Sequence, residues 1–403
     1  MRIAFIHPRY PESDGTGASH SATQIVGSLS DRGHDVTVYC TEKPSEDTTD
    51  AFDTRYLDGS GYPGHPDLQT NSALQSRINE FGDFDILHSY LMSTIPAIAS
   101  ISRSSSVNSV VTLNAYGGIC PKNDLRYLDK RECHSNGLLK CMYCSSLTSG
   151  GHDKHGRLKR TAYRVGRLEL IRRAEKSHSD IDHFHALSPH IKETYGRFGY
   201  DAENITVVPN MLDERFLVEN EADFRGPYRM LYVGYLHGHK GVDKLVPILK
   251  GLRDTSDKEF ELTIVGDGAR FSKIAQQAKE FGVEDKLIQK GHVEYSRLPS
   301  IYAEHDLFIY PGEWDEPFGR VFLEALATGT PVISSNVGSV DSIIGDAGIV
   351  TDGTIDSFVT AILNTTEQTS LLRMSENCDR EIKRYEREKL VDQFESIYSE
   401  IES

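Results

Sequence analysis

Short apolar runs alternate with helical stretches along the chain, and this alternation limits the fold more than any other feature. It is typical of parallel sheets with helices on both faces. The length of 403 residues is too great for one ordinary core, so two such domains are expected. We predict strands at Arg2–Ile6, Asp35–Tyr39, Ile86–His88, Ser109–Leu113, His183–Ala186, Ile205–Val208, Met230–Val233, Glu261–Val265, Leu287–Gln289, Leu307–Tyr310, Val332–Ser334 and Gly348–Val350.

Two carboxylates, Glu316 and Glu324, flank a Pro-Phe-Gly turn. A buried strand at Asp306–Pro311 precedes them, and a helix begins around Leu323–Ala327. The acids therefore fall at the carboxyl end of a strand, where open α/β sheets bind ligands, and backbone N–H groups at the helix start point toward an anion. This pattern suits a sugar and a ribose joined by a diphosphate. The alternative is two solvated acids beside a loop.

Glu316–Glu324 resembles the E-x7-E signature of retaining family 4 glycosyltransferases. Further resemblances to that family lie, in the family's order, at Thr16–Ala18, Arg32–Val38, Tyr232–Gly241, Ile264–Gly268 and Gly329–Ile333. Together they cover residues 1–385 or nearly so. The resemblance implies an α/β GT-B fold, with two doubly wound Rossmann-like domains facing across a cleft and a C-terminal helix returning to the first domain.

The resemblance also suggests domain limits. Residues 1–212 would form the acceptor-side domain, including a Cys-rich loop at 119–151 and a basic helix at 152–176. The polar run 213–226 is the expected linker, and residues 227–385 would form the nucleotide-sugar domain. The charged stretch Arg380–Ile401 is expected to be one helix, whose part from residue 386 onward packs back on the first domain.

Transfer from a nucleotide sugar builds negative charge on the leaving diphosphate, so fixed donors aimed at that charge are the main catalytic need. By resemblance, Lys240 binds the diphosphate, Glu316 holds the transferred sugar, and these two residues are catalytic. Glu324 would hold the ribose. The loop Gly15–Gly17 before the first helix would face the same diphosphate. The implied substrate-binding residues are Gly17, Asn114, Tyr235, Gly266, Phe318, Gly319, Arg320 and Glu324. Retention without a clear enzymic nucleophile and without a donor-site metal is the family's pattern.

The chain departs from that pattern at two positions. Tyr235 stands where the family usually has Arg, and Asn114 stands where it often has His. Loss of a charged donor at a leaving diphosphate costs roughly 10²–10³ in rate unless another group replaces it. Arg320, His237 and His239 are the candidates for that replacement. Asn can hydrogen-bond a sugar hydroxyl but cannot act as a base.

Four cysteines lie close together in the sequence: Cys120, Cys133, Cys141 and Cys144. Cys141-Met-Tyr-Cys144 has the spacing of a zinc-ligand pair. A structural Zn²⁺, a redox-active disulfide and free thiols remain as alternatives. Cys40 and Cys378 are scattered and are expected to be inert.

Between Gly151 and Lys176, nine Lys or Arg outnumber three acids, so the block carries about +6 by that subtraction. Leu158, Ala162, Val165, Leu168 and Ile171 repeat at helical spacing. A basic amphipathic helix of this kind can contact an anionic membrane or receive a lipid-linked pyrophosphate. The alternative is a surface helix whose apolar stripe packs on the sheet.

Composition narrows the possible binding partners and the possible location of the protein. A net charge of −16 argues against nucleic-acid binding. Met1–His7 reads as a strand rather than a signal peptide, and no apolar run is long enough to span a bilayer, so we expect a cytoplasmic location, at the inner membrane face for a lipid-linked acceptor. His7 and His88 are expected to be structural.

The sequence therefore predicts a retaining transferase acting on a UDP- or GDP-linked sugar, with a glycan or lipid-linked saccharide as acceptor, in cell-surface polysaccharide or glycoprotein glycan assembly. One rival is a dinucleotide-dependent oxidoreductase, which fits poorly because His20 occupies the third glycine position of the fingerprint. The other is a catalytically silent partner subunit that binds a nucleotide sugar.

Overall fold

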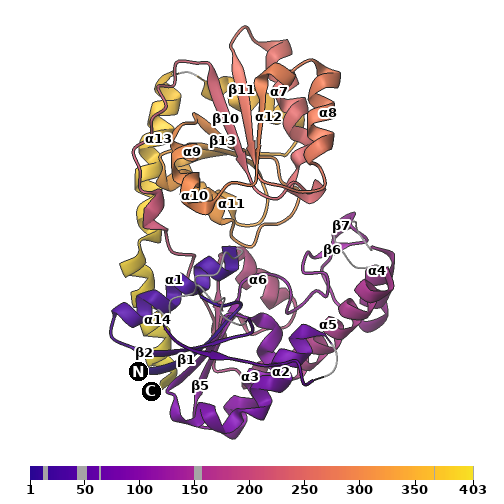
Figure 1. Cartoon of the computed structure of the whole chain (residues 1–403), viewed down its shortest axis with the longest axis vertical. Helices are drawn as coiled ribbons and strands as arrows, with labels where there is room; N and C mark the ends of the chain where they lie inside the picture. The colour runs from indigo at the N-terminus through magenta and orange to yellow at the C-terminus, as the bar shows by residue number, and fades with distance from the viewer. Residues whose placement is uncertain (12–16, 43–51, 63–64, 149–156, 367, 403) are drawn as a thin grey trace. The chain divides into compact units, whose positions relative to one another are not determined.

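The computed structural model describes residues 1–11, 17–42, 52–62, 65–148, 157–366 and 368–402, without the side chains of 157–160 and 368 (Figure 1). The predicted Gly15–Thr16 part of the first loop lies outside these ranges. The chain divides into two compact units. The first contains residues 1–211 and 387–403, and the second contains residues 212–386.

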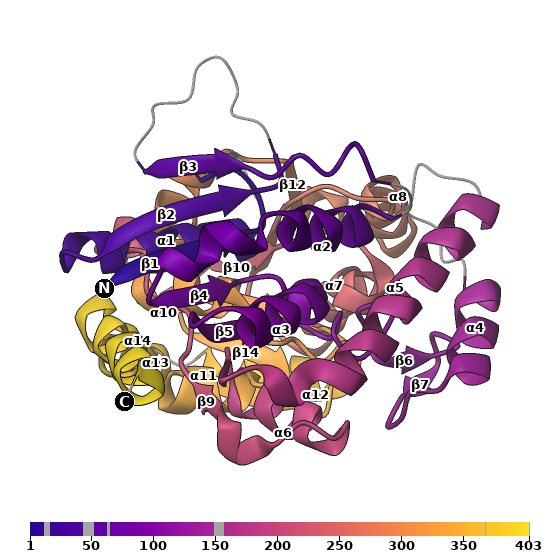
Figure 2. The same cartoon turned by 90° about the horizontal axis from the view of Figure 1, so that it is seen from below.

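A seven-stranded parallel sheet forms the centre of the first unit, in the order β3-β2-β1-β4-β5-β8-β9. Figures 1 and 2 show α1 and α14 on one side of this sheet and α2, α3 and α5 on the other. The strands are β1 (Arg2–His7), β2 (Asp35–Cys40), β3 (Asp53–Tyr56), β4 (Ile86–Ser89), β5 (Asn108–Leu113), β8 (His183–Ala186) and β9 (Ile205–Val207). The helices are α1 (Gly17–Asp31), α2 (Pro66–Ser76), α3 (Ile95–Ser104), α4 (Leu138–Leu147), α5 (Arg157–Ser177), α6 (Pro189–Arg197) and α14 (Arg387–Glu402).

The last helix, α14, is part of the first unit's core. Its apolar side chains repeat at helical spacing, and they pack with α1 and with the outward side chains Ile3 and Phe5 of β1. Leu390, Val391, Phe394, Ile397 and Tyr398 are all buried there. The predicted return of the C-terminal helix to the first domain is confirmed.

A line of hydrogen bonds joins α14 to the sheet. Tyr398 Oη lies 2.6 Å from His88 Nδ1, His88 Nε2 lies 2.8 Å from Thr112 Oγ1, and Thr112 Oγ1 lies 2.9 Å from His185 Nδ1. His185 Nε2 ends the line 2.7 Å from the Val208 carbonyl oxygen. Because a carbonyl can only accept, His185 carries its proton on Nε2. With both rings neutral, Thr112 then donates to His185 Nδ1, His88 Nε2–H donates to Thr112, and the Tyr398 hydroxyl donates to His88 Nδ1. Burial lowers the pKa of both His88 and His185, consistent with neutral rings.

The second unit holds a six-stranded parallel sheet in the order β12-β11-β10-β13-β14-β15. Helix α12 packs on α7, whereas α13 packs on α10 and α11 (Figure 1). The strands are β10 (Tyr228–Val233), β11 (Phe260–Val265), β12 (Leu287–Gly291), β13 (Leu307–Tyr310), β14 (Val332–Ser335) and β15 (Gly348–Thr351). The helices are α7 (Leu245–Thr255), α8 (Phe271–Phe281), α9 (Leu298–Ala303), α10 (Arg320–Ala327), α11 (Val340–Ile344), α12 (Ile355–Thr365) and α13 (Gln368–Ile382).

All twelve predicted strands are present, and the GT-B architecture is confirmed for the two sheets. Three strands were missed. The edge strand β3 has no buried residue and therefore no apolar pattern, and β6 (Arg126–Tyr127) and β7 (Arg131–Glu132) are two residues each.

The prediction of one helix over Arg380–Ile401 is wrong. Helix α13 ends at Ile382, a 3₁₀ turn covers Lys383–Tyr385, and α14 begins at Arg387 after an extended Glu386. No Gly or Pro marks this break. It forms because Tyr385 is buried, with its carbonyl accepting the Leu212 N–H at 2.8 Å.

The segment expected as a linker, 213–226, belongs to the second unit. Phe216 is fully buried, Asn220 Nδ2 donates to the Thr328 carbonyl at 3.1 Å, and the Glu221 N–H donates to the Ala303 carbonyl at 2.9 Å. The segment is thus packed on α9 and α10. None of the described helices combines the length and apolar character that crossing a bilayer requires.

The histidine line predicts a stability loss in acid. In the unfolded chain, the His pKa is about 6.5, whereas burial holds both folded rings neutral to lower pH, so the unfolded state binds more protons as the pH falls. The stability contributed by the neutral rings is present above about pH 6.5 and is lost below it. Thermal unfolding midpoints measured from about pH 7.5 to about pH 5 should fall, and His185→Gln should reduce that slope.

Removing the Tyr398 hydroxyl should leave His88 Nδ1 buried without a partner. Tyr398→Phe is expected to lower the free energy of unfolding by about 1–3 kcal/mol. Tyr143→Phe, at an exposed tyrosine of the same unit, is the control and should have little effect. Equal midpoints for wild type and Tyr398→Phe in denaturant titrations would show that the bond contributes nothing.

Candidate functional site

The loops after three neighbouring strands of the second unit approach one another at glycines. A Cβ on Gly266, after β11, would stand 2.0 Å from the Gly234 carbonyl oxygen after β10. A Cβ on Gly241 would stand 1.7 Å from the Pro311 carbonyl oxygen after β13. Both glycines also have positive φ, +132° and +71°. Any side chain at these positions would therefore separate the loops that carry the candidate residues.

Lys240 and Glu316 meet at this edge of the sheet. Lys240 Nζ lies 2.6 Å from Glu316 Oε2, and the Tyr310 hydroxyl donates to the same oxygen at 2.8 Å. The ammonium also lies 4.7 Å from the ring centre of Trp314, a cation–π contact. Both charged side chains are mostly shielded from solvent, with exposed fractions of 16% and 14%. The pair is therefore stronger than a surface ion pair.

The second carboxylate, Glu324, is buried in α10. Its Oε2 accepts from the Tyr302 hydroxyl at 3.1 Å, whereas the Tyr295 hydroxyl is 3.5 Å from Oε1. Arg320 Nη2 donates to Tyr295 at 3.3 Å. Burial raises the pKa of Glu324, and the Arg320 guanidinium acts in the opposite direction. The hydrogen bond from Tyr295 to Glu324 Oε1 is the longer of the two, so Oε1 is the oxygen that could exchange its partner for a ligand hydroxyl.

A left-handed turn separates the two acids. Gly319 has φ +82°, and a Cβ there would stand 2.5 Å from the Phe322 ring and 3.0 Å from Glu316 Cγ. Gly338 closes the other side, because its Cβ would stand 2.1 Å from the Glu316 carbonyl oxygen. Helix α10 begins at Arg320, three residues before the predicted Leu323.

The remaining predicted residues differ in placement. Tyr235 is 63% exposed, so its side chain is reachable from solvent. Phe318 is buried, its ring centre 6.0 Å from that of Tyr385. Asn114 follows β5 in the first unit, and its Oδ1 is buried without a hydrogen-bond partner among the described residues. Gly17 is the first residue of α1.

Sequence reasoning missed the aromatic residues around the acids. Tyr310, Trp314, Tyr302 and Tyr295 contact Lys240, Glu316 or Glu324, and Asp213 accepts from the Tyr295 hydroxyl at 3.2 Å. Tyr310 ends a buried strand, and Trp314, the only tryptophan, lies two residues before Glu316. Those positions were a usable signal. Tyr295 and Tyr302 precede Glu324, the acid that they contact, by 29 and 22 residues, and gave no such signal.

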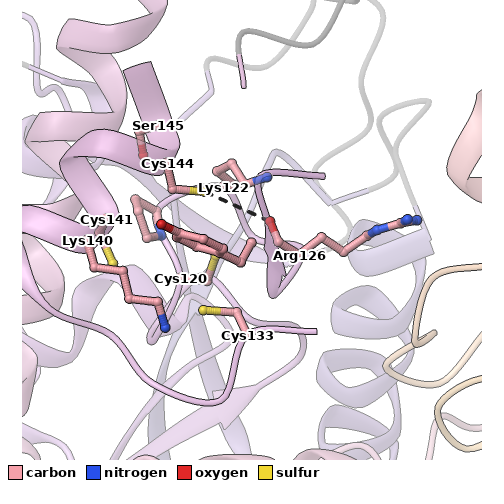
Figure 3. A pocket seen from close by; sticks show the side chains of 10 residues that line it. Cys120, Lys122, Arg126, Cys133, Lys140, Cys141, Cys144 and Ser145 are labelled. Atoms are coloured by element: carbon pink, nitrogen blue, oxygen red, sulfur yellow. Dashed lines mark hydrogen bonds between the residues drawn. The ribbon is translucent and has the colours of Figure 1, made fainter. Parts of the chain in front are cut away.

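The four cysteines lie in an insert that follows β5 in the first unit. They line one hollow together with residues of β6 and α4 (Figure 3). Within the described ranges, no three side chains of His, Cys, Asp or Glu already stand in an arrangement that would hold a metal ion. The outlying Cys40 and Cys378 are buried.

The basic block is a helix, α5, from Arg157, although residues 151–156 lie outside the described ranges. Its apolar side chains Leu168, Leu170 and Ile171 are buried, and the helix packs on α2, α3 and α4. Arg164 donates to the carbonyls of Ser145 and Thr148, which end α4. Of the predicted stripe, Leu168 and Ile171 are thus packed on neighbouring helices, whereas Ala162 and Val165 are exposed.

Two family models match the chain and together cover most of it. Residues 15–216 match Glycosyltransferase Family 4, and residues 213–384 match Glycosyl transferases group 1.

Curated relatives match over part of their length. Glycogen synthase of Mycobacterium tuberculosis is 34% identical over 155 residues, which are 38% of this chain and 37% of the relative. O-antigen chain mannosyltransferase B of Escherichia coli is 31% identical over 142 residues, 35% of this chain and 37% of the relative. The matched part thus spans little more than a third of these relatives.

Solved structures match over nearly the whole chain. Sucrose-phosphate synthase from Thermosynechococcus elongatus has a TM-score of 0.73 at 18% identity, covering 100% of this chain and 99% of its own. Alr3699/HepE of Anabaena, in complex with UDP and glucose, has a TM-score of 0.71 at 16% identity, covering 99% of each chain. At these identities the likeness shows the fold. The family models and this fold agree with the paired acids, and the chain belongs to glycosyltransferase family 4, with the GT-B fold.

Proposed function

We propose that this protein transfers a sugar, with retention of anomeric configuration, from a UDP- or GDP-linked donor to a glycan or lipid-linked saccharide in cell-surface polysaccharide or glycoprotein glycan assembly. The observation that carries the proposal is the shielded Lys240–Glu316 pair beside a second buried acid, Glu324, at the carboxyl edge of a parallel sheet. A nucleotide diphosphate sugar presents an anion between two hydroxyl-bearing groups. This edge offers one cation, Lys240, and two acceptors, Glu316 and Glu324.

Lys240 is the group for the diphosphate. Its ammonium now neutralises Glu316 at 2.6 Å, and a bound diphosphate would compete for it with a greater negative charge. Glu316, held by Tyr310, would then accept from a sugar hydroxyl and stabilise the positive charge that develops at the anomeric carbon. Glu324 Oε1 would accept from a ribose hydroxyl. The backbone amides of the Gly319 turn, at the start of α10, would then face the sugar.

UDP is the first nucleotide to test. One structural neighbour, Alr3699/HepE, was solved with UDP and with UDP-glucose, and such a donor fits the arrangement above. GDP remains the second candidate. No donor-site metal enters the proposed mechanism.

The acceptor we propose is carried at an anionic membrane surface on the cytoplasmic side. Helix α4 exposes Leu138, Leu139, Met142, Tyr143 and Leu147, and Leu139 is 81% exposed. This apolar surface lies beside the basic helix α5. Apolar side chains flanked by Lys and Arg are typical of segments that bind the interface of anionic bilayers. The contact is thus proposed through α4, with the 152–176 segment supplying charge.

A silent partner subunit remains the second candidate because Tyr235 supplies no charge where the family usually has Arg. Such a subunit would bind a nucleotide sugar and release no nucleotide. The variant Tyr235→Arg discriminates between a transferase and a silent partner subunit, because it restores the positive charge of the family's arginine at an exposed position.

The transferase proposal is tested by nucleotide release from UDP- and GDP-sugars with membrane extract as the acceptor source. Lys240→Ala should lower kcat by about 10²–10³-fold, because it removes a fixed donor to the leaving group. Glu316→Gln should also lower kcat strongly. Lys250→Ala is the control, since this charge is more exposed and is paired with Asp254 instead of Glu316. Donor binding without release by wild type would favour the silent partner.

Glu324→Gln should act mainly on donor binding. Loss of a charged acceptor for ribose should raise the donor KM by about 10- to 100-fold with a smaller change in kcat. Since burial raises the pKa of Glu324, wild-type donor affinity should weaken on acidification at a higher pH than for an ordinary glutamate. Glu376→Gln, on the exposed face of α13, should change neither quantity. A kcat loss with constant KM would assign Glu324 to the chemical step instead.

Membrane contact is tested with vesicles of phosphatidylcholine, with and without phosphatidylglycerol. We expect co-sedimentation only with the anionic vesicles, falling as salt rises. Leu139→Asp should abolish it, whereas Leu372→Asp, at an exposed leucine of α13, should not. Equal sedimentation with neutral vesicles, or indifference to Leu139→Asp, would contradict the contact.

A further inference from the structure

Helix α4 buries its thiols and exposes its large apolar side chains. Cys141, Cys144 and Ser145 are its buried residues, whereas its leucines, methionine and tyrosine face solvent. Cys141 and Cys144 are three positions apart and therefore share one face of the helix. A helix held by the hydrophobic effect would show the reverse arrangement. Something other than apolar packing must hold α4 to its neighbours.

Four cysteine side chains, from separate positions in the chain, line one small hollow. Cys120, Cys133, Cys141 and Cys144 line it, along with Lys122, Arg126, Tyr127 and Lys140 (Figure 3). Its volume is about 20 Å³, enough for a single water-sized particle. Three of the sulfurs belong to buried residues, and Cys133 is half-buried. The hollow thus has the size and the donor number of one four-coordinate ion.

The chain between the first two cysteines has a strained backbone. Asn123, Leu125, Leu128 and Asp129 all have positive φ, between 49° and 60°. Non-glycine residues in this conformation persist where their surroundings fix them. The two-residue strands β6 and β7 cannot do so alone. Lys122, paired with Asp124 and Asp129, and the Cys133 N–H, which donates to the Leu125 carbonyl at 2.7 Å, hold the turn itself. A central ion would join this turn to α4.

The surroundings of the hollow suit thiolates. The Leu128 N–H donates to Cys144 Sγ at 3.3 Å. The basic side chains of Lys122, Arg126 and Lys140 line the hollow, and Lys122 is also paired with Asp124 and Asp129. A divalent cation bound by four thiolates carries a net charge of −2, so these cations complement the complex.

We propose that Cys120, Cys133, Cys141 and Cys144 bind one Zn²⁺ tetrahedrally, and that this ion holds α4 and the turn of β6 and β7 together. On binding, four thiols lose four protons to solvent and turn inward. At present Cys133 Sγ donates to the Ser135 carbonyl at 3.2 Å, and Cys144 Sγ lies 4.0 Å from the Arg126 carbonyl, so both thiols would exchange these partners for the ion. The site is independent of the donor-binding residues in the second unit.

Metal analysis of the full chain, purified without chelators or nickel resin, is the first experiment. We expect about one Zn²⁺ per chain, and loss of it in Cys141→Ser and Cys144→Ser. The control Cys40→Ser should retain the ion, because Cys40 is buried elsewhere in the same unit. Zinc-free protein with six titratable thiols, a disulfide among the four cysteines, or iron in place of zinc would each overturn the proposal.

A second measurement on the wild type covers the case in which the variants fail to fold. Titration with a mercurial thiol reagent should release zinc to a colorimetric chelator in step with modification of the four thiols. Limited proteolysis before and after chelation should then show new cleavage between residues 120 and 148, while fragments of the second unit remain unchanged. Zinc release without thiol modification, or identical cleavage with and without the ion, would overturn the structural role. Neither readout depends on transfer activity.

Discussion

The close approach of backbone loops in the second unit determines where its charged groups stand. Gly266 allows the turn after β11 to contact the Gly234 carbonyl. Gly241, which directly follows Lys240, allows the loop after β10 to contact the Pro311 carbonyl. Lys240 and Glu316, 76 positions apart in the chain, meet because of this contact. A Cβ at Gly241 or Gly266 would stand 1.7 or 2.0 Å from a carbonyl oxygen, so the loops would have to separate and the 2.6 Å contact between ammonium and carboxylate would be disturbed. The arrangement of the site is thus a property of the backbone first and of the charged residues second.

The two units bury polar groups in different ways. In the first unit, His88 and His185 are neutral, and every proton in their line has an acceptor, so the line fixes α14 to the sheet without a net charge. In the second unit, Glu316 and Glu324 are held by tyrosine hydroxyls and a cation. A neutral, satisfied network suits a structural role, whereas partly satisfied buried charge suits a site that exchanges partners with a ligand.

Sequence reasoning located the strands because buried parallel strands are continuous apolar runs. It singled out Glu316 and Glu324 from a local motif and Lys240 from the resemblance to the family, and the structure brings Lys240 and Glu316 together. It failed where position depends on contacts distant in sequence. Tyr302 reaches Glu324 only through the packing of α9 against α10. The break at Glu386 has no local signal, since it follows from burial of Tyr385.

The missing arginine at Tyr235 shows the same limit of local reasoning. Sequence offered Arg320, His237 and His239 as replacements. Arg320 donates a hydrogen bond to Tyr295, and its positive charge stabilises the carboxylate form of Glu324. Its guanidinium is therefore engaged on the ribose side of the proposed site. The two histidines stack on each other with ring centres 5.7 Å apart, and His239 meets Trp314 edge-on at 5.8 Å. Since the Lys240 ammonium lies over the same Trp314 ring, His239 stands next to the lysine that is paired with Glu316. In the proposed reaction, imidazole N–H donors beside that lysine would be the substitute for the lost charge, and they would stabilise a leaving diphosphate less than a guanidinium does.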